Sequence, residues 1–169
     1  MAAIELEGFE EYIKQLSALN KSSYKLCKYT VYPGAKVLAD ALRAEVNGLP
    51  AMSDNAAKAH WRAGAVMPMI SESQKIGLQD SLGISPITRS RGGRVQCSVG
   101  FEGYNRVVTH HFPNGQPNNE VARSLEKGTS YLQRDAFATR AVKAATNPAI
   151  EAMAEAADEY VQKVMDANG

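Results

Sequence analysis

The sequence predicts an α+β fold, in which N-terminal helices precede a small antiparallel sheet with a central hairpin and C-terminal helices pack on the sheet. Apolar residues recur at helical spacing in the first and last thirds of the chain, over residues 8–47 and 135–164. Between them the pattern changes, because residues 94–112 alternate in polarity or are rich in β-branched side chains. The 169 residues fit a single domain, 1–169, with room for a real core.

Two helices are expected in the N-terminal third. The first covers residues 8–19, where four apolar residues recur at helical spacing: Phe9, Ile13, Leu16 and Leu19. The second covers residues 23–47 and contains Pro33. Because proline removes a backbone donor and clashes one turn back, we expect a kink or a restart at this position. The turn residues 47–50 end the helix.

Two shorter helices follow. Ser53 is a candidate N-cap for residues 54–64. Ser71 and Gln74 have the spacing of a capping box for a helix over residues 71–84, and Gly83 is expected to be the glycine that ends it. The apolar residues around them, Trp61 and residues 67–70, suit either core packing or a subunit interface.

The clearest expected feature is a β-hairpin over residues 94–112. Residues 95–101 alternate apolar and polar side chains, residues 104–112 form a second β-prone run, and Glu102–Gly103 supplies a two-residue turn. In that register Phe101 faces Tyr104. Residues 113–119 have the composition of a loop.

The last third of the chain is expected to be helical. The alanine-rich segment 135–146 favours a helix, and Pro148 suits the first turn of a separate final helix. One stripe of that helix is apolar through to the C-terminus: Ile150, Met153, Ala157, Tyr160, Val161 and Val164.

Composition excludes several classes of protein. Nineteen basic and eighteen acidic residues give a net charge of +1, which is not the signature of a nucleic-acid binder. The start of the chain does not have a signal-peptide pattern, and no stretch approaches the roughly 20 apolar residues of a membrane span. Cys27 and Cys97 lack metal or redox spacing and are expected to be buried thiols. We therefore expect a soluble protein made in a cytoplasm.

No catalytic, cofactor or metal site is expected. His110 and His111 would lie on one strand, where adjacent side chains point to opposite faces and cannot converge on one ion. Cys97 would lie on the apolar side of its strand, where a thiol is inert. An enzyme that uses one of the two histidines is therefore the least favoured interpretation.

Four arginines gather around the expected hairpin: Arg89, Arg91, Arg94 and Arg106. They could form a basic finger that faces phosphates or an acidic partner. They could equally be ordinary solvated loop charges, since no aromatic residues for base stacking are interleaved with them.

Three blocks of the sequence resemble a known family when they are taken together. They are residues 4–16, then residues 77–84 leading into the hairpin segment 100–105, and then residues 116–145 followed by 149–153. The chain resembles the neck or tail-completion proteins of long-tailed bacteriophages, the gene-product-ten family of lambdoid siphophages, in the branch seen in phages of low-GC Gram-positive bacteria. The ordered residues that carry the resemblance most strongly are Arg123, Glu126, Gly128, Thr129 and Phe137, with Gly103 in the hairpin turn.

The resemblance implies a structural role without catalysis. It implies a virion protein that forms a ring, joining the DNA-filled head to the tail or completing the head-proximal end of the tail. The implied partners are other copies of the chain, neighbouring connector or head-closure, tail-terminator and tail-tube proteins, and phage DNA in the channel, with assembly in the host cytoplasm. A hexamer is favoured over a dodecamer. The alternative is an accessory protein that binds nucleic acid without sequence specificity through the four arginines.

Overall fold

The computed structural model describes residues 17, 19–20 and 23–167, and the helix expected over 8–19 lies largely outside them. The described residues contain five complete helices and six short strands. The strands form three pairs, two antiparallel and one parallel. The predicted α+β class is therefore confirmed.

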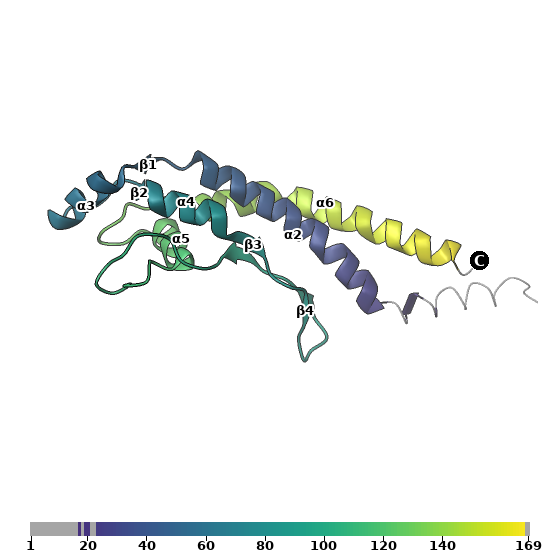
Figure 1. Cartoon of the computed structure of the whole chain (residues 1–169). Coiled ribbons are helices and arrows are strands. Elements are labelled where there is room, and N and C mark those ends of the chain that lie inside the picture. The colour runs from purple at the N-terminus through teal and green to yellow at the C-terminus, as the bar shows by residue number, and fades with distance from the viewer. Residues whose placement is uncertain (1–16, 18, 21–22, 168–169) are drawn as a thin grey trace, which may run out of the picture.

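Two long helices run antiparallel along the length of the molecule (Figure 1). They are α2 (Ser23–Gly48) and α6 (Phe137–Asp166). Their contact faces are rich in small residues, which let the two backbones approach closely. The buried small residues are Gly34 and Ala39 on α2, and Ala141, Ala145 and Ala156 on α6. Toward the end of the pair the rings of Tyr29 and Tyr160 pack with centroids 5.5 Å apart.

Both long helices continue through a proline. Of the kink or restart expected at Pro33, the restart does not occur, and the separate helix expected from Pro148 is wrong, because α2 and α6 are each one continuous helix. A proline inside a helix costs about 3 kcal/mol through a lost hydrogen bond and a steric clash. The packing of each helix along the other, on both sides of the proline, offsets that local cost.

The hydrophobic core lies where the end of α2 meets the start of α6. Phe137, at the start of α6, and Leu78, on α4 (Glu72–Ser81), are completely inaccessible to solvent. Around them pack the other large core residues: Leu42, Val46, Leu49, Ile70, Val121, Leu125 and Leu132. The core therefore joins the helix pair to the smaller elements beneath it (Figure 1).

The two short helices begin as expected. In α3 (Asp54–Arg62) the Ser53 side chain accepts a hydrogen bond from the Ala56 N–H, and α4 begins with a complete Ser71–Gln74 capping box. The helix expected to end at Gly83 instead ends at Ser81, and the chain passes directly into a strand. Gly83 lies in that strand without a positive φ, so its expected role as a helix-ending glycine is wrong.

A short parallel pair of strands closes the excursion that contains α3. β1 (Ala51–Met52) pairs with β2 (Ile70–Ser71). Just after each strand, the Asp54 carboxylate accepts hydrogen bonds from the Ser73 hydroxyl and N–H. The hydrogen bond from the Ser73 side chain is the main cause that lowers the pKa of Asp54 below 3.8, against an opposing effect of burial.

The expected hairpin over residues 94–112 is wrong, because its first strand pairs with an earlier segment. β6 (Val99–Phe101) pairs antiparallel with β3 (Leu82–Ile84), and β5 (Val95–Gln96) pairs with β4 (Thr88–Arg89). These four strands form one long, interrupted hairpin, here called the arm, residues 82–101. Its tip projects from the body beside α2 (Figure 1).

Residues 102–117, expected as the second strand and a loop, form a long irregular segment pinned at its base. The Asn105 N–H donates to the Gln116 carbonyl at 2.9 Å, and the Asn118 N–H donates to the Gly103 carbonyl at 3.0 Å. The side chains of Asn105 and Asn118 are both buried and lie against Gly77 of α4. Asn118 also begins α5 (Asn118–Lys127), a helix that the sequence analysis did not foresee.

We expect Gly77→Ala to destabilise the protein. A Cβ at this position would lie 2.5 Å from the Asn105 Cβ and 2.6 Å from the Asn118 Oδ1 atom. Overpacking costs about 1–3 kcal/mol, more than the gain in helix propensity of up to ~1 kcal/mol. Urea denaturation measures the change. The control is Gly48→Ala, whose Cβ meets nothing within 4 Å, and equal stability of the two variants would contradict the packing described.

We expect Asp54 to contribute stability that depends on pH. Because its pKa is lowered in the folded state, the contribution is present above the ordinary value of 3.8 and is lost as pH falls through the lower folded value. Asp54→Asn should therefore be less stable than the wild type at neutral pH, and the difference should shrink in acid. Unfolding curves at several pH values test this, and a difference that grows in acid would contradict it.

Candidate functional site

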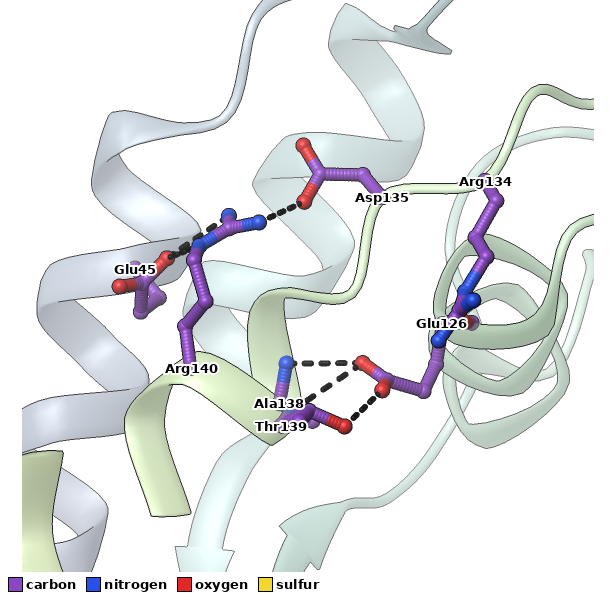
Figure 2. A network of polar contacts seen from close by, with 7 residues as sticks. All are labelled: Glu45, Glu126, Arg134, Asp135, Ala138, Thr139 and Arg140. Atoms are coloured by element: carbon purple, nitrogen blue, oxygen red, sulfur yellow. Dashed lines mark hydrogen bonds and ion pairs between the residues drawn. The ribbon is translucent and has the colours of Figure 1, made fainter. Parts of the chain in front are cut away.

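Glu126, one of the residues that carry the family resemblance, lies at a joint between α5 and α6 (Figure 2). The N-cap residue of α6 is Ala136, whose side chain cannot accept a hydrogen bond from the first N–H groups of the helix. The Glu126 carboxylate of α5 takes that role by accepting from the Ala138 N–H at 2.9 Å and the Thr139 N–H at 3.4 Å, and also from the Thr139 hydroxyl. A carboxylate at a helix N-terminus satisfies unpaired donors and complements the helix dipole.

The turn after α5 is built by the next residues of the same motif. Gly128 caps the helix with φ +74°, a conformation that disfavours larger residues. The Thr129 hydroxyl accepts hydrogen bonds from the Tyr131 and Leu132 N–H groups. Arg134 then returns to donate to the Glu126 carbonyl at 3.0 Å. These hydrogen bonds hold the turn that brings the chain from α5 to the start of α6.

The other motif residues have different surroundings. Phe137 is fully buried, with its ring centroid 6.0 Å from that of Phe101 at the base of the arm. Gly103 has φ +68° and accepts the hydrogen bond that starts α5. Arg123 is exposed and forms no ion pair with another described residue.

A charged contact that the sequence analysis missed ties the joint to α2. Arg140 of α6 binds Asp135 at 2.7 Å and Glu45 of α2 at 2.8 Å (Figure 2). The hydrogen bond to Asp135, followed by that to Glu45, raises the pKa of the Arg140 guanidinium. Arg140 and Glu45 are 95 residues apart in the sequence, so local sequence patterns could not predict that they form an ion pair.

The arginines expected to cluster do so only in part. Arg89, Arg91 and Arg94 are exposed at the tip of the arm, whereas Arg106 lies beyond its base, in the segment 102–117. At the tip, the Arg89 guanidinium lies over the ring of Tyr24 at 5.3 Å from its centroid. Lys28 lies 5.7 Å from the centroid of the same ring. The start of α2 thus supplies an aromatic residue and a further cation to this surface.

The two adjacent histidines do not point to opposite faces of a strand. Residues 110–111 form a bend, and the two imidazole rings meet edge to face with centroids 5.6 Å apart. The expected orientation is wrong because residues 104–112 never join the sheet. Within the described part of the chain, no group of three or more histidine, cysteine or acidic residues is placed to hold a metal ion.

The two cysteines differ in their exposure. Cys27 is exposed on α2, so its expected burial is wrong, whereas Cys97 on the arm is half-buried. Burial raises the pKa of the Cys97 thiol. A raised pKa lowers the fraction of reactive thiolate at neutral pH.

Apolar side chains are exposed near α3. Trp61 is 62% exposed, Val66 52% and Tyr131 60%. Tyr131 lies beside this segment, because its carbonyl accepts from the Met67 N–H at 2.8 Å. Of the residues expected as an apolar patch, Ile70 belongs to the core instead, with 1% exposure.

An open depression of about 590 Å³ lies where the arm meets the segment 102–117. Its lining is partly aromatic, from Phe101, Tyr104 and Phe112, and its titratable side chains are Glu102 and Glu120. An open, partly aromatic surface of this kind suits a contact with a partner.

No protein-family model, no curated protein and no solved structure matches the chain. Among the described helices, none is both long and apolar enough to cross a bilayer.

We expect Glu126→Ala to cost about 1–2 kcal/mol of unfolding free energy, because it leaves the first N–H groups of α6 without their acceptor. Glu126→Gln should cost less, since an amide oxygen can still accept. Arg123→Ala on the same helix is the control and should change stability by less than about 0.5 kcal/mol. Chemical denaturation compares the three variants, and equal losses for Glu126→Ala and Arg123→Ala would contradict the capping role.

Proposed function

We propose that the chain is a structural virion protein of a bacteriophage, which forms a ring at the head-tail junction. The ring joins the DNA-filled head to the tail or completes the head-proximal end of the tail. The observation that supports this is the joint between α5 and α6. Four residues that carry the family resemblance lie at or next to this joint: Glu126, Gly128, Thr129 and Phe137. Each has a structural role there, as a helix cap, a turn residue or a buried core residue, so the resemblance rests on residues that the fold uses.

The shape of the protein fits a role in assembly. A closed ring needs two different surfaces on each copy, one for each neighbour. An elongated helix pair with a projecting arm presents well-separated surfaces (Figure 1). Large apolar side chains are exposed outside the arm, with Tyr104 at 67% and Val108 at 65% in the segment 102–117 and Trp61 on α3. Exposed aromatic residues are enriched where proteins bind one another.

The partners in this proposal are those of a neck protein. Copies of the chain form the ring, with six favoured over twelve. The neighbouring connector or head-closure, tail-terminator and tail-tube proteins bind its two sides, and phage DNA passes through the channel. The protein is made in the host cytoplasm and ends in the virion.

A second candidate function is nonspecific nucleic-acid binding by an accessory protein. The observation that favours it is the contact between Arg89 and Tyr24, which adds an aromatic ring to the basic tip of the arm. Basic grooves with aromatic residues bind single strands through phosphate contacts and base stacking.

Deletion of the gene from the phage or prophage that encodes it tests the ring proposal. We expect DNA-filled heads and separate tails in electron micrographs, and complementation with the intact gene should restore joined particles. The chain should also be detected in purified virions in a copy number that matches a closed ring. Normal infectious particles without the gene would refute the proposal, and unpackaged DNA with intact necks would favour the accessory function.

A further inference from the structure

An acidic stripe runs along the second half of α6. Glu151, Glu155, Asp158 and Glu159 are all exposed. With about 100° of rotation per residue, these positions fall on one side of the helix, within a sector of about 100°. Gly34 of α2 contacts Met153, and Ala156 is buried, so the side of α6 that faces α2 is a different one.

The charges of this stripe are not compensated within the described part of the chain. The ion pairs between described residues use other acids, namely Asp40, Glu45 and Asp135. From residue 147 to residue 166 the sole basic residue is Lys163, against five acidic residues: Glu151, Glu155, Asp158, Glu159 and Asp166. Like charges at this spacing repel one another weakly, so the stripe is suited to a basic partner.

A basic surface lies at the tip of the arm and the start of α2. Arg89, Arg91 and Arg94 are exposed there, together with Lys25 and Lys28. Neither contributing segment, residues 85–98 of the arm or 23–39 of α2, contains an acidic residue. The contact of Arg89 with the ring of Tyr24 joins the two segments.

The two charged surfaces belong to different sides of the helix pair. The arm packs along α2, through contacts of β3, β5 and β6 with that helix. The acidic stripe lies on α6, and Figure 1 shows the tip of the arm on the α2 side of the pair. One copy therefore carries a basic surface on one side and an acidic surface on another, which prevents the two from neutralising each other within the copy.

We propose that the acidic stripe of one copy binds the basic arm tip of the next copy. This inference rests on the proposed ring and identifies its two interface surfaces. The contact is heterologous, because different residues of each copy meet, and repeated contacts of this kind close into a ring. The stripe from Glu151 to Glu159 is about 12 Å long at 1.5 Å per residue, which is long enough to receive the tip of one hairpin.

Two observations favour a second copy over DNA as the partner of the arm. The net charge of the whole chain is only +1, so long-range attraction to a polyanion is weak. DNA bound to the arm would also leave the acidic stripe unpaired, because the phosphates of DNA carry the same sign of charge as the stripe. A second copy satisfies both surfaces at once.

Sedimentation velocity of the purified chain tests the interface. At about 20 mM salt, where the Debye length is ~20 Å, we expect association that grows with protein concentration, and at about 0.5 M salt we expect it to weaken. The arm variant R91E/R94E and the stripe variant E155R/E159R should each lose self-association by at least about tenfold in affinity. The control variant K127E/K143E carries the same charge change as the arm variant but outside both surfaces, and it should associate like the wild type.

Mixing the two variants is the decisive step. The arm variant then has an acidic arm and an acidic stripe, and the stripe variant has a basic arm and a basic stripe, so neither should associate alone and an equal mixture should associate with the two variants alternating. Combining all four substitutions in one chain should restore self-association. A wild-type chain that stays monomeric at every concentration, or a mixture that behaves as the sum of its parts, would overturn the interface.

The same variants separate this inference from the proposed function. If the arm binds DNA instead, R91E/R94E will weaken the binding of a duplex measured by fluorescence anisotropy. In that case E155R/E159R will leave any self-association unchanged, and this result would show that the proposed interface is wrong. Failure of the interface in solution leaves the gene-deletion test of the neck function unaffected, because that test depends on particle morphology.

Discussion

The packing of α2 against α6 is the constraint on which the rest of the structure depends. Small residues such as Gly34, Ala141 and Ala145 let the two helices approach closely over most of their length. That contact offsets the local cost of a proline in each helix. It also fixes where α6 must begin, and therefore where α5 and its Glu126 carboxylate must lie to cap it.

The helix pair also explains how the protein presents its surfaces. The core occupies one end of the pair, where Phe137 packs on the base of the arm through Phe101. The other end carries the basic start of α2 on one side of the pair and the acidic stripe of α6 on another. Since the chain has almost no net charge but separates its charges on a rigid frame, its electrostatics suit directional contacts between proteins more than attraction to a polyanion.

The sequence predicts correctly those features of the fold that depend on residues close together in the chain. The Ser53 cap and the Ser71–Gln74 capping box each depend on neighbouring residues, and both are confirmed. The sequence does not predict features that depend on residues far apart in the chain, such as which strands pair. β6 pairs with β3 rather than with the segment after Gly103, because the buried Asn105 turns the chain away from the sheet. Likewise, the resemblance marked Glu126 as important, but only its position opposite α6 reveals what it does.

Native-state hydrogen exchange along α2 and α6 tests the central role of the helix pair most directly. If packing makes each helix one unit despite its proline, amides on both sides of Pro148 should exchange with the same free energy, equal to that of the facing amides in α2. Loss of Glu126 should then lower protection along the whole of α6. The account would be contradicted if the residues before and after Pro148 exchanged as two independent segments.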